Sequence, residues 1–411
     1  MTANRAGEIA RFLAQPVLAR LLQALDGEGE ETRVVGGAVR NLLLGEPASD
    51  IDLATTALPE ETIRRGRAAG FKAVPTGIEH GTVTLVADGT SFEVTTLRRD
   101  VETDGRRAKV VFGRDFLADA LRRDFTINAL GLGRDGELHD YCGGLDDLAQ
   151  RRVRFIGDAA ARIREDYLRI LRFFRFHARY GAGEPDAEGL NACIAGREGL
   201  AGLSRERVRA ELLKLLAAPG VVATLAAMAG AGLLMPMIGG VPHLARFAAV
   251  AEDEGEGVCP AFRLAALTVS VGEDALRLRE RLRLSNEEFD RTERIARALE
   301  GLGGRSGLPA IAVLRHVAHG AGTDAAAAAL VLLNASERGE GRDAVQRLIG
   351  EFGRTPRFVP TGKDIIGLGI LPGPRVGQVL DAARQGWIEA GCPAGADAQM
   401  EFIRTALAAA R

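Results

Sequence analysis

Cysteine is scarce in this chain of 411 residues, and no two cysteines are closely spaced. The four lie far apart, at Cys142, Cys193, Cys259 and Cys392. Structural zinc sites and redox motifs need cysteines within a few residues of each other, so the spacing argues against both. We therefore expect these cysteines to be small core residues in a reducing compartment.

The sequence also lacks an excess of charge of either sign, with 53 Lys and Arg against 55 Asp and Glu and a net charge of −2. A balanced total does not exclude a nucleic-acid partner, because binding depends on where the charge lies. Almost all of the cationic residues are Arg, whose planar guanidinium suits two-point recognition of anionic groups better than Lys does.

The pattern of neither a secretion signal nor a clear membrane span is expected here. Residues 1–25 mix Arg and Glu in an amphipathic pattern, which predicts a surface helix. Residues 217–245 carry no charged side chain and are long enough to cross a membrane. Pro219, Pro236 and Pro242 interrupt this run, so packed short helices are favoured over a membrane span. We expect a cytoplasmic protein with no membrane partner, and no protein partner is evident.

The chain divides into two parts with different periodicities. Between residues 30 and 155, strand patterns such as ETRVVGG, SDIDLATT, GTVTLVADG and SFEVTTLRR alternate with turns and helices. After about residue 157 the strand patterns disappear, and helical patterns separated by Gly and Pro replace them. The predicted fold class is α+β, with a mixed sheet and helices first and an all-α remainder. The predicted domains are residues 1–155, 156–222, 223–340 and 341–411.

A Gly-Gly turn joins a predicted strand to a helix in VVGGAVRNLLLG. Gly36 and Gly37 would let backbone N–H groups approach an anion closely, and the helix N-terminus favours phosphate there. Arg40 follows about one helical turn later. A tight structural turn explains the same pattern equally well, so this motif alone does not decide between the two interpretations.

Two carboxylates in SDIDLATT are predicted to share one face of a strand. Asp50 and Asp52 are two residues apart, so their side chains project together while Ile51 packs behind them. Like charges this close repel unless a cation lies between them, and oxygen ligands beside a phosphate suit Mg²⁺. Glu93, in SFEVTTLR, is a candidate third catalytic carboxylate. The alternatives are helix-capping aspartates on an edge strand and an exposed strand glutamate.

Two segments further along the chain combine arginine with other polar residues at helical spacing. In LRRDFTINAL (121–130), Arg123 is a candidate triphosphate ligand, and the alternative is a solvated helix face. In the same segment, Asp124 and Asn128 are candidates for orienting the sugar of a nucleotide. In ARIREDYLRILRFFRFHARYG (161–181), a basic stripe with apolar backing suits phosphates and bases, and the alternative is a domain-boundary helix. The residues of that stripe, each three apart and predicted to follow one side of a helix, are Asp166, Arg169, Arg172 and Arg175.

In this order, the segments resemble the bacterial-type (class II) tRNA nucleotidyltransferases, the family of CCA-adding enzymes and poly(A) polymerases. GGAVRNLLLG and SDIDLATT resemble the catalytic signature, DGRR at 104–107 the flexible loop, and RRDFTINAL the ribose motif. EDYLRILRFFRF resembles the nucleobase-selecting motif, and LSRERVRAELLKLL the neck motif. The resemblance extends to TGKDIIGLGILPGPRVGQVL and so covers most of the chain.

The resemblance implies a catalytic head at 1–155, a neck at 156–222, a body at 223–340 and a tRNA-binding tail at 341–411. It assigns two Mg²⁺ ions to Asp50 and Asp52. The nucleotide-binding residues that it implies are Gly36, Gly37, Arg40, Arg123, Asp124, Asn128, Asp166, Arg169, Arg172 and Arg175. The chain departs from the family at Asn41, where Asp is common, and at Tyr167, where Pro is usual.

The implied reaction adds C, C and A to the 3′ end of tRNA from CTP and ATP, with release of pyrophosphate. Cytosine and adenine both present an amino donor beside a ring-nitrogen acceptor, which suits acceptance by Asp166 and donation by Arg169. Uracil and guanine reverse this pattern. The alternatives are a poly(A) polymerase, an enzyme adding only CC or only A, transfer to another acceptor, and a non-catalytic RNA-binding protein.

Overall fold

The structure is a computed structural model that describes residues 3–48, 50–104, 107–253, 259–303, 307–353 and 356–409. The centre of the DGRR segment (105–106), and the side chains of residues 99–110, lie outside the described part. The chain forms two compact units, Met1–Leu233 and Leu234–Arg411. The predicted domain boundaries, after residues 155, 222 and 340, stay predictions.

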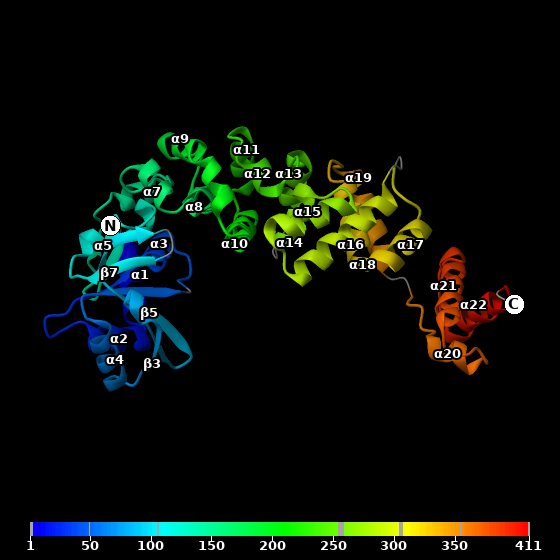
Figure 1. Cartoon of the computed structure of the whole chain (residues 1–411), viewed down its shortest axis with the longest axis horizontal. Coiled ribbons are helices and arrows are strands. Elements are labelled where there is room, and N and C mark those ends of the chain that lie inside the picture. Colours follow the sequence, from blue (N-terminus) through cyan, green and yellow to red (C-terminus); the bar gives the residue numbers. More distant parts are fainter. Residues whose placement is uncertain are drawn as a thin grey trace. The chain divides into compact units, whose positions relative to one another are not determined.

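The first unit is built on a seven-stranded mixed sheet, in blue and cyan in Figure 1, with the strand order β3-β4-β5-β2-β1-β8-β9. Strands β2 and β5 pair in parallel, and the other neighbours are antiparallel. The strands are β1 (Thr32–Val35), β2 (Ile51–Thr55), β3 (Lys72–Gly77), β4 (Thr82–Ala87), β5 (Thr90–Thr96), β8 (Gly131–Gly133) and β9 (Leu138–His139). Alternate residues of β4 are buried, as expected for a strand that packs one face on a core.

Helices cover this sheet and leave the polar end of β2 accessible. They are α1 (Ala3–Leu13), α2 (Pro16–Leu25), α3 (Gly37–Leu44) and α4 (Pro59–Ala68). Residues 1–25 therefore form two helices rather than the single surface helix predicted, because Pro16 begins a second one. The leucines of α2 are buried, so this helix contributes to the core.

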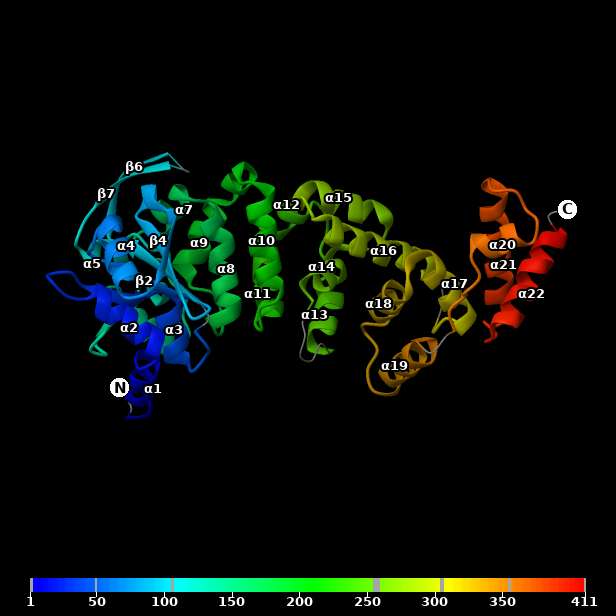
Figure 2. The same ribbon diagram turned by 90° about the horizontal axis from the view of Figure 1, so that it is seen from below.

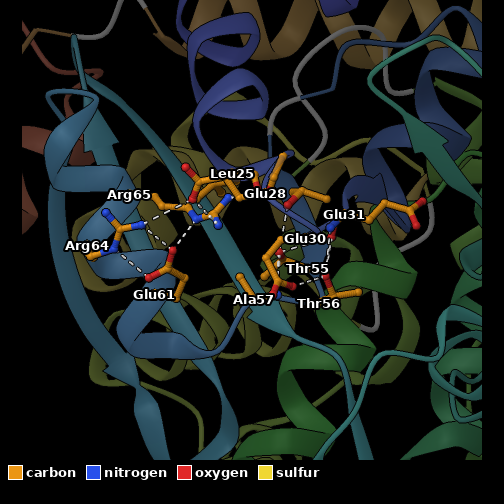
Figure 3. A network of polar contacts seen from close by, with 12 residues as sticks. Leu25, Glu28, Glu30, Glu31, Thr55, Thr56, Ala57, Glu61, Arg64 and Arg65 are labelled. Carbon is orange, nitrogen blue, oxygen red and sulfur yellow. Dashed lines mark hydrogen bonds and ion pairs between the residues drawn. The ribbon is translucent and has the colours of Figure 1, made fainter.

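A polar network fixes the far end of β2 (Figure 3). The Arg65 side chain of α4 is buried and donates to Glu61 at 2.6 Å and to the Gly27 carbonyl at 2.7 Å. Thr56, just after β2, donates to Glu30 at 2.5 Å, and Thr55 bonds the Thr32 hydroxyl of β1 at 2.8 Å. Because buried polar groups that are fully paired favour one arrangement, the network fixes the strand that carries Asp52.

The segment after the sheet differs from the helix predicted for residues 121–130. A two-stranded ribbon of β6 (Arg98–Asp104) and β7 (Arg107–Phe112) leads into a short helix, α5 (Phe116–Leu121). The chain then turns and forms the 3₁₀ turn η2 (Thr126–Asn128). The helical setting predicted for Asp124 and Asn128 was therefore wrong. The backbone instead turns inward to pair Phe125 with Phe155.

Helices complete the first unit, and α8, α10 and α11 lie side by side (Figure 2). They are α6 (Gly144–Ala149), α7 (Ala159–Glu165), α8 (Leu168–Tyr180), α9 (Ala187–Ala195), the 3₁₀ turn η3 (Arg197–Gly202), α10 (Arg205–Leu216) and α11 (Val221–Gly230). The aromatic rings of α8 pack on the head, where Phe173 stacks on Phe155 with centroids 5.4 Å apart. The single helix predicted over 161–181 was wrong, because the chain is extended at Asp166 and divides it into α7 and α8.

The second unit contains no strand among its described residues, which confirms the all-α expectation. Its helices are α12 (Leu234–Ile238), α13 (Leu244–Asp253), α14 (Pro260–Thr268), α15 (Gly272–Leu282), α16 (Asn286–Leu302), α17 (Ile311–Ala321), α18 (Thr323–Leu333), α19 (Glu340–Gly353), α20 (Gly362–Gly367), α21 (Pro374–Glu389) and α22 (Ala396–Ala409). Within the described ranges, every helix is too short or too polar to cross a membrane. The predicted α+β class is confirmed.

Candidate active site

One cavity of about 740 Å³ in the first unit brings together residues from β2, α3, α8 and α10 and from the turn after α5. The predicted site residues that line it are Gly36, Gly37, Arg40, Asp50, Asp52, Arg123, Asp124, Asn128, Asp166, Arg169, Arg172 and Arg175. The further polar residues that line it are Asn41, Arg122, Arg207 and Lys214. Glu93 is not among the lining residues, although it lies beside Asp52 on the neighbouring strand.

Gly36 gives the strand-to-helix turn its shape. Its φ of +72° lies in the region that favours glycine, and its N–H donates to the Leu130 carbonyl at 3.0 Å. A Cβ atom on Gly36 would lie 3.0 Å from Nη1 of Arg123. The glycine therefore lets the arginine approach the backbone at the start of α3, where helix N–H groups point outward.

The two aspartates lie at the start of β2 and are exposed in the cavity. Within the described residues, neither carboxylate has a hydrogen-bond or ion-pair partner. The cavity walls limit hydration of Asp52 and so raise the pKa of its carboxyl; Glu93 and Asp50 raise it further, and Arg123 opposes them. A pair of unpaired carboxylates that repel each other fits a divalent cation with oxygen ligands.

Two carboxylates would leave most positions around such a cation to water and ligand oxygens. Among the described residues no group of three or more His, Cys, Asp or Glu side chains is placed to hold a metal ion. This donor set suits Mg²⁺, which keeps several waters and is bound through one or two carboxylates plus substrate phosphates.

Asp119 is a buried acid in α5 that holds the arginines of the RRDF segment. Burial alone would raise the pKa of Asp119, but Arg123 and Arg122 outweigh it and hold that pKa below its usual range. Arg123 donates to Asp119 at 3.0 Å and to the Asn128 carbonyl at 3.3 Å. Asp119 precedes these arginines by three and four residues, a helical spacing that could have identified the pair from sequence.

Asp124 connects the turn after α5 to the arginine helix. The Asp124 side chain is buried and accepts from Asn128 Nδ2 at 3.1 Å and from Arg172 Nε at 2.7 Å. Asn128 in turn accepts from Arg40. Arg40 is 6 % exposed, and its guanidinium carbon lies 4.0 Å from the centroid of the Tyr180 ring. Burial lowers the pKa of Arg40.

The predicted base-selecting pair lies at the break between α7 and α8. Asp166 accepts from the Leu168 N–H at 3.0 Å and from Arg207 of α10 at 2.6 Å. Arg169 donates to Glu165 and to the Arg162 carbonyl. Asp166 and Arg169 therefore both line the cavity, but their side chains bond to other protein groups rather than to each other.

Arg175 pairs with Glu211 of α10 at 2.5 Å. Neither this contact nor the pair of Arg207 with Asp166 was predicted. Arg207 and Asp166 are 41 residues apart, and their contact depends on how α8 packs against α10. Local spacing carries no signal for such a contact.

Tyr167, where the family usually has Pro, has a backbone conformation that proline can also adopt. Its φ of −61° is the value that proline favours at the start of a helix. The ring of Tyr167 lies over Gly199, where a Cβ atom would come within 2.1 Å of it.

Comparisons with known proteins agree with this geometry. Residues 32–154 match the Poly A polymerase head domain, and residues 186–247 match the probable RNA and SrmB-binding site of polymerase A. The sheet, the carboxylate pair and the arginine-lined cavity thus belong to an enzyme of the nucleotidyltransferase class.

Relatives that cover nearly the whole chain define the family. The chain is 37% identical over 396 residues to CCA tRNA nucleotidyltransferase 1, mitochondrial, of Mus musculus, which covers 94% of this chain and 89% of the relative. The human protein of the same name is 36% identical, over 92% of this chain and 87% of its own. A Bacillus stearothermophilus CCA-adding enzyme in complex with CTP superposes with a TM-score of 0.70 at 26% identity, over 98% of this chain and 99% of that one. The chain belongs to the CCA tRNA nucleotidyltransferase family.

Proposed function

We propose that this enzyme adds C, C and A to the 3′ end of tRNA from CTP and ATP and releases pyrophosphate. The observation that carries the proposal is the cavity in which the Asp50–Asp52 pair faces the arginines of α8. Family membership supports it, since relatives over nine-tenths of the chain are named for this activity.

Asp50 and Asp52 would hold two Mg²⁺ ions together with the triphosphate. When bound, these ions supply a lowered pKa for the RNA 3′-hydroxyl and charge neutralisation for the leaving pyrophosphate. The chain itself contributes a strand that keeps both carboxylates on one side of the cavity. Glu93 stays a predicted catalytic residue, and its place beside Asp52 supports a role in setting the charge at that position.

The groups around the carboxylates would orient the nucleotide. The Gly36 turn would bring the triphosphate close to the backbone at the start of α3, where the Gly37 N–H and the Arg123 side chain would contact it. Asp124 and Asn128 would contact the ribose hydroxyls, and the hydrogen bond from Arg40 to Asn128 would hold the amide in position. Holding the reacting groups in line supplies much of the rate in phosphoryl transfer.

Base selection would use the hydrogen-bond acceptors of Asp166 and the donors of Arg169 that are not already bonded to other protein groups. Each oxygen of an ionised carboxylate can accept about two hydrogen bonds. Asp166 uses one position on each oxygen, for Leu168 and Arg207, and retains others for an exocyclic amino group. Arg169 retains donors for a ring nitrogen. A uracil or guanine would place like groups against both side chains, which costs affinity strongly in a site built to hydrogen-bond.

The test is incubation of tRNA lacking its 3′ end with CTP alone, ATP alone and both, followed by sequencing of the product. We expect CC from CTP alone and CCA from the mixture. Long A tails on varied RNAs would establish the poly(A) polymerase alternative instead. Asp50→Ala should lower the rate by about a thousandfold or more, because several kcal/mol of charge stabilisation are removed. The cytoplasmic location and the lack of a protein partner stay predictions.

A further inference from the structure

The hydroxyl of Tyr180, near the end of α8, contacts the helix that follows the Gly-Gly turn. Arg40 Nη2 donates to this hydroxyl at 2.7 Å, and the hydroxyl donates to Asn41 Oδ1 at 3.3 Å. Arg40 also donates to Asn41 Oδ1, from Nη2 at 2.9 Å and from Nε at 3.2 Å. The Tyr180 ring stacks on Phe176 with centroids 5.8 Å apart. One tyrosine therefore fixes a buried arginine both by its ring and by its hydroxyl.

These contacts form part of a closed network that begins and ends on α8. From Tyr180 the network passes to Arg40 and from Arg40 Nη1 to Asn128. Asn128 donates to Asp124, which accepts from Arg172 two helical turns before Tyr180. Hydrogen bonds thus connect the Tyr180 hydroxyl, through Arg40, to Asn128 and Asp124, although Tyr180 does not line the cavity itself.

We propose that Tyr180 is a positioning residue for ribose recognition, acting through Arg40 on the Asn128 side chain. The proposal rests on the proposed function, in which Asp124 and Asn128 contact the ribose. Arg40 donates to Asn128 Oδ1, and this contact turns the Asn128 amide nitrogen toward Asp124. Without the tyrosine hydroxyl, Arg40 keeps its charge but loses one of the contacts that set its orientation.

The experiment compares Tyr180→Phe with the wild-type enzyme, using ATP and 2′-deoxyATP as substrates on tRNA ending in CC. The variant keeps the aromatic stack and removes only the hydroxyl. We expect the preference for ATP over 2′-deoxyATP, measured as a ratio of kcat/KM values, to fall about fivefold, the effect of one net hydrogen bond. A loss of fold stability alone would lower both kcat/KM values equally and leave the ratio unchanged.

Two further variants sharpen the experiment. Tyr141→Phe is the matched control, because the Tyr141 hydroxyl also accepts from an arginine, Arg33 at 2.9 Å, but lies outside the cavity lining. Its ratio should equal that of the wild type. Tyr180→Phe combined with Asn41→Asp should recover most of the preference, because an ionised carboxylate at position 41 would hold the Arg40 guanidinium more strongly than the amide does.

An unchanged ratio in Tyr180→Phe overturns the proposal, whether or not the melting temperature falls. So does a drop of the same size in Tyr141→Phe. Failure of the proposed function is a separate result, since it would appear as a wild-type enzyme that adds neither C nor A to tRNA.

Discussion

Replacement of Asp52 by Asn should stabilise the metal-free protein while abolishing nucleotide addition. Asp52 lies beside Glu93 on the adjacent strand and two residues from Asp50. Neighbouring strands are about 4.8 Å apart, and residues i and i+2 about 6.6 Å. At these separations two unit charges in water repel by about 0.9 and 0.6 kcal/mol. Attraction to Arg123 offsets part of this repulsion. The net gain in free energy of unfolding should be about 0.5–1 kcal/mol.

The gain should depend on pH in a defined direction. Because the folded protein raises the pKa of Asp52, the ionised carboxylate costs stability at neutral pH, and protonation removes the cost. The advantage of Asp52→Asn should therefore be full at pH 7 and shrink as the pH falls toward 3.8, the ordinary value for Asp. Thermal unfolding in EDTA measures this stability difference, and the Tm of the first unit should be about 1–4 °C higher in Asp52→Asn than in the wild type at pH 7. Mg²⁺ should raise the Tm of the wild type and not that of the variant.

Asp88→Asn provides the control, because Asp88 forms an ion pair with Arg20 at 3.0 Å, whereas Asp52 forms no ion pair among the described residues. The same change of Asp to Asn should have almost no effect there, since exposed ion pairs contribute little. A lower Tm for Asp52→Asn than for the wild type in EDTA would refute the repulsion argument.

Three further substitutions test other parts of the site. Gly36→Ala should lower the free energy of unfolding by about 1–2 kcal/mol in urea, because φ is +72° and the new Cβ would meet Arg123, and it should raise the KM for both nucleotides. Arg207→Met should lower discrimination of CTP from UTP about tenfold in kcat/KM, since Asp166 loses the contact that orients it. Asp147→Asn should cost about 3 kcal/mol in urea without changing nucleotide choice, because Asp147 is fully buried and holds two arginines outside the cavity.

The sheet and its carboxylates were predictable because their signals are local. Strand β2 and helix α3 follow from a few adjacent residues, in which apolar side chains alternate with polar ones and glycine marks the turn. The parallel pairing of β2 with β5 aligns Asp52 with Glu93, and the sequence pattern had already named both residues as candidates.

The break at Asp166 was not predictable in the same way. Helical spacing continues through Asp166 in the sequence, but its backbone is extended and its carboxylate accepts from the N–H of Leu168, the first residue of α8. Asp favours helix starts over helix interiors, which argues for a break at this position. The regular three-residue spacing from Asp166 to the arginines instead favoured one continuous helix. The four-residue spacing of Asp124 and Asn128 also predicted a helix wrongly. Their side chains do form a hydrogen bond, but a 3₁₀ turn rather than an α-helix brings them together.

The partners of the arginines required the fold. Tyr180 and Arg207 approach their partners only because α8 packs on the head and on α10, and no local pattern encodes such contacts. The sequence therefore identified which side chains line the cavity far better than it identified what holds them there.

The distance in sequence between Arg40 and Tyr180 has a consequence for synthesis. These residues are 140 positions apart, and the last strand of the sheet ends at His139, whereas α10 ends at Leu216. At about 5–20 residues per second, translation of the intervening segment takes roughly 4–15 s. At the start of that interval the nascent chain contains the complete sheet, with both aspartates, and the arginines of α8 and then of α10 are added as translation proceeds. The full cavity lining is therefore present only after α8 and α10 are translated, and a chain truncated before α10 would lack Arg207 and Lys214.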